Sequence, residues 1–154
     1  MKTIIWLVAR ALSRIFWILP TKNNKVLFFS FGGKQYSCNP KYVSEYISSN
    51  YQGEVEIVWA FTNPEDYGRL AETGVKTVKM NSWSFLRDFF SANVIVTNDS
   101  FHPLLEKRRN QTLVQTWHGG GAYKRVGKDT RLYSRGALKR LTLTMQNVDL
   151  YVSS

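Results

Sequence analysis

The chain has 154 residues, 44% of them hydrophobic, and a formal net charge of +10. That length is enough for one domain with a sizeable core, in which about 70% of the unfolded surface becomes buried. The single cysteine, Cys38, excludes an internal disulfide and favours a reduced cytoplasmic setting, and with only His102 and His118 no metal site is expected.

The positive charge is concentrated towards the two ends of the chain. Residues 1–25 carry five basic and no acidic side chains, and residues 101–154 carry ten basic and three acidic ones, whereas residues 26–100 carry six basic and eight acidic ones. We therefore expect two anionic partners, a membrane surface and a substrate. A nucleic-acid partner is not expected, because the aromatic residues fall mainly in apolar segments instead of alternating with basic residues on one surface.

Residues 1–20 are expected to form an amphipathic helix that associates with a membrane. At 100° per residue, Arg10 and Arg14 share one side, flanked by Trp6 and Trp17, and apolar residues occupy much of the remainder. The arginines interrupt the apolar run before the roughly 20 residues that a span requires, and Arg10 also breaks the apolar part of a signal peptide. Aromatic residues and arginines on a short helix suit the bilayer interface. The alternative is a helix that docks on the protein's own core.

After this segment, apolar runs alternate with residues that cap helices. A polar linker at residues 21–25 precedes the expected strands at residues 26–31, 55–61, 75–80, 93–97, 113–116 and 148–152. Helices are expected to begin at Asn39-Pro40, Asn63-Pro64 and Ser82, and a basic helix is expected over residues 132–146 with Leu138, Leu141 and Met145 inward. This alternation predicts an α/β domain over residues 25–154 with a mostly parallel, Rossmann-like sheet.

The most informative stretch follows the strand expected near residue 114. His118 stands where that strand ends, the three glycines Gly119–Gly121 come next, and Lys124, Arg125 and Lys128 supply positive charge. In open α/β sheets ligands bind outside the carboxyl ends of the strands, and glycines let backbone N–H groups approach an anionic oxygen. Histidine exchanges protons near neutral pH. Together these residues suit a phosphate-containing substrate with a hydroxyl to be deprotonated. The alternative is a flexible turn beside a structural histidine.

Asp99 is a second candidate at the same edge of the sheet. It follows the strand expected at residues 93–97, so its carboxylate shares the carboxyl edge with His118. A carboxylate there suits two catalytic roles, orienting the imidazole or accepting a proton from a substrate hydroxyl. A cap of a turn or helix is the other interpretation.

Three motifs resemble one known family. The first is Trp117-His118-Gly119 followed by a lysine, a glycine and an aspartate, the second is residues 28–33 with Tyr36 and Asn39-Pro40, and the third is residues 147–154. Over about residues 25–154 the chain is similar to the CDP-glycerol glycerophosphotransferases, which build or prime teichoic acids and related polymers. Gly120 stands where that family commonly has threonine.

The resemblance implies transfer of glycerol phosphate, or a related polyol phosphate, from a CDP-activated donor to a lipid-linked or polymer hydroxyl. It makes His118 the general base and Lys124 a phosphate ligand, and the remaining expected phosphate-binding residues are Gly32, Gly33, Gly119, Gly120, Gly121 and Arg125. The CDP-polyol is the donor substrate, and no cofactor is expected.

The same resemblance implies a two-domain fold of the GT-B type. This chain is long enough for the acceptor-side half, so the nucleotide-donor half is expected beyond residue 154. The expected location is peripheral, on the cytoplasmic face of the cell membrane. A membrane-held, phosphate-binding module without turnover is the alternative function.

Overall fold

The computed structural model describes residues 8, 10–99, 105–118, 136, 138, 142 and 145–152. Within them lies one six-stranded sheet, in the order β3-β2-β1-β4-β5-β6, in which every neighbouring pair is parallel. The strands are β1 (Lys22–Phe29), β2 (Glu56–Phe61), β3 (Lys76–Lys79), β4 (Ala92–Thr97), β5 (Thr112–Gln115) and β6 (Leu150–Tyr151). The predicted Rossmann-like α/β fold is confirmed, because this is the order of two mononucleotide-binding halves joined at β1 and β4.

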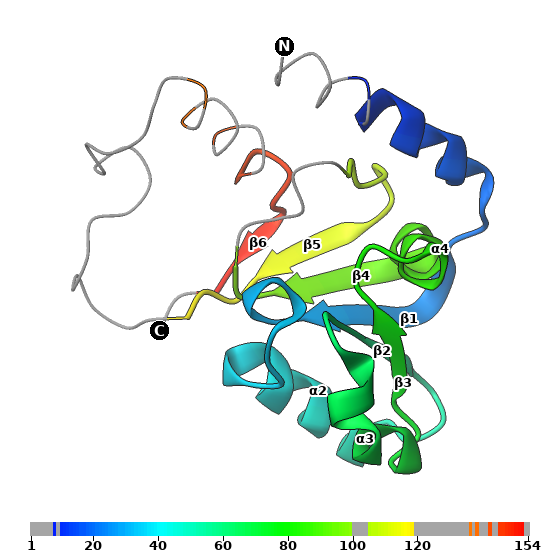
Figure 1. The fold of residues 1–154 in the computed structure, drawn as a ribbon, viewed down its shortest axis with the longest axis vertical. Coiled ribbons are helices and arrows are strands. Elements are labelled where there is room, and N and C mark those ends of the chain that lie inside the picture. Colours follow the sequence, from blue (N-terminus) through cyan, green and yellow to red (C-terminus); the bar gives the residue numbers. More distant parts are fainter. Residues whose placement is uncertain are drawn as a thin grey trace.

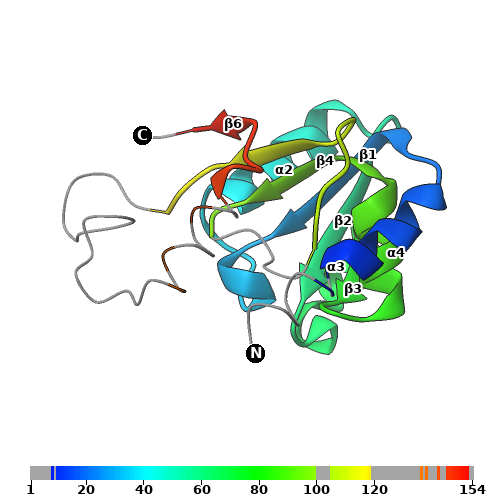
Figure 2. The same ribbon diagram turned by 90° about the horizontal axis from the view of Figure 1, so that it is seen from above.

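Helices cover both faces of the sheet (Figures 1 and 2). The helical elements are the 3₁₀ turns η1 (Arg14–Ile18), η2 (Phe31–Gly33) and η3 (Pro64–Tyr67), and the α-helices α2 (Cys38–Asn50), α3 (Arg69–Glu72) and α4 (Trp83–Ser91). One face carries α4 and the N-terminal helical segment, and the opposite face carries α2 and α3. Strands buried on both sides read as continuous apolar runs, which is why they could be located from the sequence.

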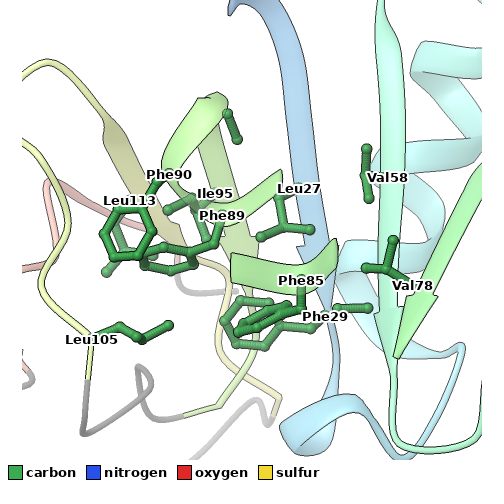
Figure 3. Close-up of a cluster of buried hydrophobic side chains, with 12 residues drawn as sticks. Leu27, Phe29, Val58, Val78, Phe85, Phe89, Phe90, Ile95, Leu105 and Leu113 are labelled. Carbon is green, nitrogen blue, oxygen red and sulfur yellow. The ribbon is translucent and has the colours of Figure 1, made fainter. Parts of the chain in front are cut away.

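Adjacent side chains of β1 pack into two separate hydrophobic cores, one on each face of the sheet. Leu27 and Phe29 point into the core under α4, which contains Phe85 and Phe89 (Figure 3). Phe28 points to the other face, where it stacks on Trp59 with ring centroids 5.5 Å apart. Because both faces are packed, the open places for a ligand lie at the two edges where the strands begin and end.

The polar segment at residues 21–25 is not a linker, so this prediction was wrong. β1 begins at Lys22, and Lys25 is only 3% exposed. The ammonium of Lys25 bonds Asp88 Oδ1 at 2.8 Å, Glu56 Oε1 at 2.9 Å and Ser91 Oγ at 3.1 Å. Its partners come from β2 and α4, so the charge is compensated by residues far away in sequence.

The helix boundaries were predicted in part. Ser82 caps α4 by accepting a hydrogen bond from Phe85 N, as expected. The helix α2 begins at Cys38 with Ser37 as its N-cap, so the expected cap at Asn39 was wrong. Of the basic helix expected over residues 132–146, four described residues are helical: Gly136, Leu138, Thr142 and Met145. Met145 was expected to point inward, but it is exposed. Leu141 lies outside the described residues.

The N-terminal segment docks on the sheet domain through one side. Residues 10–13 are helical, and in η1 the ring of Phe16 stacks on Phe90 with centroids 5.4 Å apart. Arg14 donates two hydrogen bonds to the carboxylate of Glu106, both at 3.1 Å. Docking was the alternative interpretation of this segment, and it holds for residues 10–18. No helix within the described ranges is long and apolar enough to cross a membrane.

Candidate active site

The candidate site lies at the carboxyl edge of the sheet, where β1, β4 and β5 end. Phe31 follows β1, Asn98 and Asp99 follow β4, and His118 follows β5. The strand order reverses between β1 and β4, which is the position where open α/β sheets bind ligands. Three segments that are distant in sequence therefore meet at this edge of the sheet.

The imidazole of His118 is held by a main-chain group. Its Nδ1 lies 2.6 Å from the carbonyl oxygen of Asn98. A carbonyl oxygen only accepts, so Nδ1 carries the hydrogen and donates it. In the neutral ring Nε2 then keeps its lone pair, which is the arrangement a general base requires.

Two aromatic rings enclose His118. The ring of Phe31 meets it edge-on with centroids 5.3 Å apart, and the ring of Trp117 stacks beside it at 5.0 Å. Both neighbours have positive φ angles, 48° for Phe31 and 57° for Trp117, which bulky residues rarely adopt. Such conformations persist where the surroundings enforce them, and they cluster at functional sites.

The side chain of Gln115 enforces the conformation at Trp117. Its Oε1 accepts a hydrogen bond from Trp117 N at 3.0 Å, and its Nε2 donates to the carbonyl oxygen of Asp99 at 2.5 Å. Gln115 is buried, so both halves of its amide are used inside the protein. It joins the ends of β4 and β5 and so fixes the residue before His118. The sequence carried a signal for it, because Gln115 is a polar residue directly after the apolar pair Leu113-Val114.

Asn98 and Asn39 complete the support of the site. Asn98 Oδ1 accepts from Phe31 N at 2.9 Å, while the main-chain carbonyl of Asn98 holds His118. Asn39 Nδ2 donates to Thr116 O at 2.9 Å. These roles could not be predicted from the sequence, because a main-chain acceptor leaves no residue signature and Asn39 has the pattern of a helix cap.

The two glycines after β1 differ in their surroundings. A Cβ on Gly33 would lie 3.1 Å from Met80 Cε and 3.2 Å from the carbonyl oxygen of Ala60, so packing against β2 and β3 explains this glycine. A Cβ on Gly32 would meet nothing within 4 Å, and Gly32 has a φ of 65°. Gly32 is thus the one with open space beside its backbone, and phosphate binding by either glycine stays a prediction.

Asp99 lies at the site, half-buried, but the ring of His118 is oriented through the Asn98 carbonyl. The main-chain N–H of Asp99 donates to Thr97 Oγ1 at 3.2 Å, and its carbonyl accepts from Gln115. Both bonds fix the turn after β4. A catalytic role for the Asp99 carboxylate stays a prediction.

The remaining site predictions fall outside the described residues. These are Gly119, Gly120, Gly121, Lys124 and Arg125. Within the described ranges, no three histidine, cysteine, aspartate or glutamate side chains lie close enough to hold a metal ion.

Residues 11–154 match the family model of the CDP-glycerol:poly(glycerophosphate) glycerophosphotransferases. The chain belongs to this family. It is 35% identical over 111 residues to a teichoic acid poly(glycerol phosphate) polymerase of Staphylococcus epidermidis, and 30% identical over 136 residues to one of Bacillus spizizenii. A histidine variant of the wall teichoic acid polymerase TagF superposes with a TM-score of 0.76 at 27% identity and covers 97% of this chain.

The chain matches only part of the length of these relatives. It spans 15% of the Staphylococcus epidermidis polymerase, 34% of the Bacillus spizizenii polymerase and 39% of the TagF structure. The family agrees with the resemblance inferred from the three motifs, and the parallel α/β fold agrees with the prediction made from the alternation of strands and helices.

Proposed function

We propose that this chain supplies the acceptor-activating part of a transferase that moves glycerol phosphate, or a related polyol phosphate, from a CDP-activated donor to a lipid-linked or polymer hydroxyl. The single observation that carries this proposal is the bond of His118 Nδ1 to the Asn98 carbonyl at 2.6 Å, in a family of glycerophosphotransferases. It leaves Nε2 as the proton acceptor at the edge where ligands bind.

In the proposed reaction, His118 Nε2 takes the proton of the acceptor hydroxyl. The acceptor oxygen forms a bond to the phosphorus of glycerol phosphate, and the bond from that phosphorus to CMP breaks, with CMP leaving. Fixing the ring against Phe31 and Trp117 removes the need to order it during the reaction. Gly32 and the basic residues after His118 are the proposed ligands of the transferred phosphate.

The donor is proposed from the family and from a solved TagF structure that was soaked with CDPG. A transfer assay tests the function. A chimera in which residues 11–154 replace the matching segment of a teichoic acid poly(glycerol phosphate) polymerase is expected to release CMP from CDP-glycerol and to lengthen an acceptor. The 154-residue chain alone is expected to show no turnover, since it spans 39% of TagF.

Two results would contradict this proposal. Turnover by the 154-residue chain alone would show that a complete reaction centre lies within it. A folded chimera that binds CDP-glycerol but releases no CMP would favour the alternative, a phosphate-binding module without turnover.

We further propose that the protein is peripheral on the cytoplasmic face of the cell membrane, and that the outer side of its N-terminal segment enters the bilayer interface. The side of this segment that carries Arg14 and Phe16 contacts the protein. Its outer side is apolar and includes Leu12, Ile15 and Ile18, the last of which is 87% exposed. Arg10 and Arg14 both pair with Glu106 of the sheet domain, and a helical segment that holds its arginines in this way and turns its aliphatic residues outward suits a lipid surface rather than water.

The membrane proposal predicts that Ile15→Glu weakens vesicle binding about 10- to 100-fold, the effect of keeping one aliphatic side chain out of the bilayer. Ile15 is 69% exposed, so the fold is expected to tolerate the change. Val43→Glu, an exposed aliphatic position on α2 on the opposite face, is the matched control and is expected to change nothing. Equal binding of Ile15→Glu and the wild type in vesicle sedimentation would contradict the proposal.

A further inference from the structure

A charged cavity opens at the amino edge of the sheet, opposite the edge that carries His118. Its volume is about 410 Å³, and it lies where β1, β2 and β3 begin, beside α4. Its lining contains four basic side chains and two carboxylates, Lys22, Lys25, Lys76, Arg87, Glu56 and Asp88. The reaction proposed above uses none of them.

The carboxylates in this cavity are already paired with lysines. Asp88 is fully buried and bonds Lys25 at 2.8 Å and Lys76 at 2.6 Å. Glu56 bonds Lys22 and Lys25, each at 2.9 Å. Burial by itself would raise the pKa of Asp88, but the hydrogen bonds from the two lysines lower it below its usual value. Both carboxylates therefore stay ionised at neutral pH, and the four basic groups leave an excess of two positive charges.

The excess positive charge is available to a ligand because several N–H donors of the cavity have no partner within the described residues. The three donors of the Lys25 ammonium are all used, by Asp88, Glu56 and Ser91. Lys22 and Lys76 each donate one hydrogen bond to a carboxylate. Because an ammonium has three donors, two remain on each lysine for a ligand. Arg87 is exposed and makes no hydrogen bond or ion pair within the described part of the chain. Its planar fork of donors fits the oxygens of a phosphate.

The surroundings of the cavity indicate where such a phosphate comes from. Leu19 and Pro20 line it, directly after the exposed Ile18 at the end of the apolar segment. On α4, Trp83 lies one turn before Arg87 and is 78% exposed. The donors of the cavity thus border the apolar side that we propose to enter the bilayer interface.

We propose that this cavity binds the phosphate of an anionic lipid headgroup through Lys22, Lys76 and Arg87. The inference rests on the membrane part of the proposed function. It adds a lipid preference to it: the apolar side provides attachment to any bilayer, and the cavity selects anionic lipids. The same chemistry would also hold a free phosphate, so the test separates the two sources.

Vesicle sedimentation of the 154-residue chain tests the cavity. The wild type is expected to bind vesicles containing phosphatidylglycerol more tightly than vesicles of phosphatidylcholine alone. Arg87→Gln is expected to weaken binding to the phosphatidylglycerol vesicles about fivefold, and to leave binding to phosphatidylcholine unchanged. Arg69→Gln is the matched control, because Arg69 is an exposed arginine on α3, on the opposite face. It is expected to bind both vesicles as the wild type does.

An equal loss in Arg69→Gln and Arg87→Gln would overturn the proposal, since binding would then reflect the net charge of +10 and no particular site. An Arg87→Gln variant that keeps the full preference would also overturn it. A wild type that binds no vesicles would refute the membrane part of the proposed function. In that case an NMR titration with inorganic phosphate decides: shifts of the Arg87 side-chain signals would assign the cavity to free phosphate, and their absence would overturn the site.

Discussion

Asp88→Ala is expected to lower the free energy of unfolding by about 3–5 kcal/mol, because it removes the central anion of a buried ion network. Asp88 is fully buried and contacts the ammonium groups of Lys25 and Lys76. The change leaves Lys25, which is also buried, with one carboxylate instead of two. Urea unfolding monitored by tryptophan fluorescence measures the loss.

Two further variants separate charge from packing. Asp88→Asn keeps an oxygen that accepts from Lys25 and is expected to lose less stability than Asp88→Ala. The double variant Lys25→Met/Asp88→Leu removes the buried charges together and is expected to recover most of the loss, since Lys22 still pairs with Glu56 at 2.9 Å. A loss below about 1 kcal/mol in Asp88→Ala would contradict the importance of this network.

The pH dependence follows from the lowered pKa of Asp88. The folded state stabilises the ionised carboxylate of Asp88 more than the unfolded state does. The contribution of Asp88 to the free energy of unfolding is therefore fully present above the ordinary pKa of 3.8. It is lost as the pH falls through the lower pKa of the folded state. The stability difference between the wild type and Asp88→Asn should therefore shrink as the pH falls below about 4.

The order of the elements could be predicted because each central strand is buried on both faces. Val26 to Phe29 and Ile57 to Phe61 are uninterrupted apolar runs, and the parallel sheet follows from their alternation with helices. The place of His118 could be predicted for the same reason, since carboxyl ends of parallel strands meet at one edge. Neither inference needs a contact between residues that are distant in sequence.

The missed features all depend on such contacts. In the sequence, Lys25 belongs to a polar segment that has the pattern of a linker. Its partner Asp88 is 63 positions away, so their ion pair is visible only in the folded structure. The carbonyl of Asn98 orients His118 through a main-chain atom that every residue possesses. Gln115 fixes Trp117 by reaching Asp99, and that geometry exists only once β4 and β5 are paired.

The central claim is that His118 is the general base, and its substitution in the active chimera tests this most directly. His118→Ala is expected to lower kcat about 10²–10⁴-fold and to leave the thermal midpoint nearly unchanged. His118→Asn is the matched variant. Its amide nitrogen can still donate to the Asn98 carbonyl in place of Nδ1, but it has no basic Nε2. It is therefore expected to fold like the wild type and to be as inactive as the alanine variant.

A structural histidine would give the opposite pattern. His118→Ala would then lower the thermal midpoint, and the asparagine variant would restore both stability and activity. The decisive measurement is kcat for CMP release by the His118→Asn chimera, taken together with its thermal midpoint. We predict a loss of at least about 100-fold in kcat at an unchanged midpoint. A kcat near that of the wild type would contradict the assignment of His118 as the base.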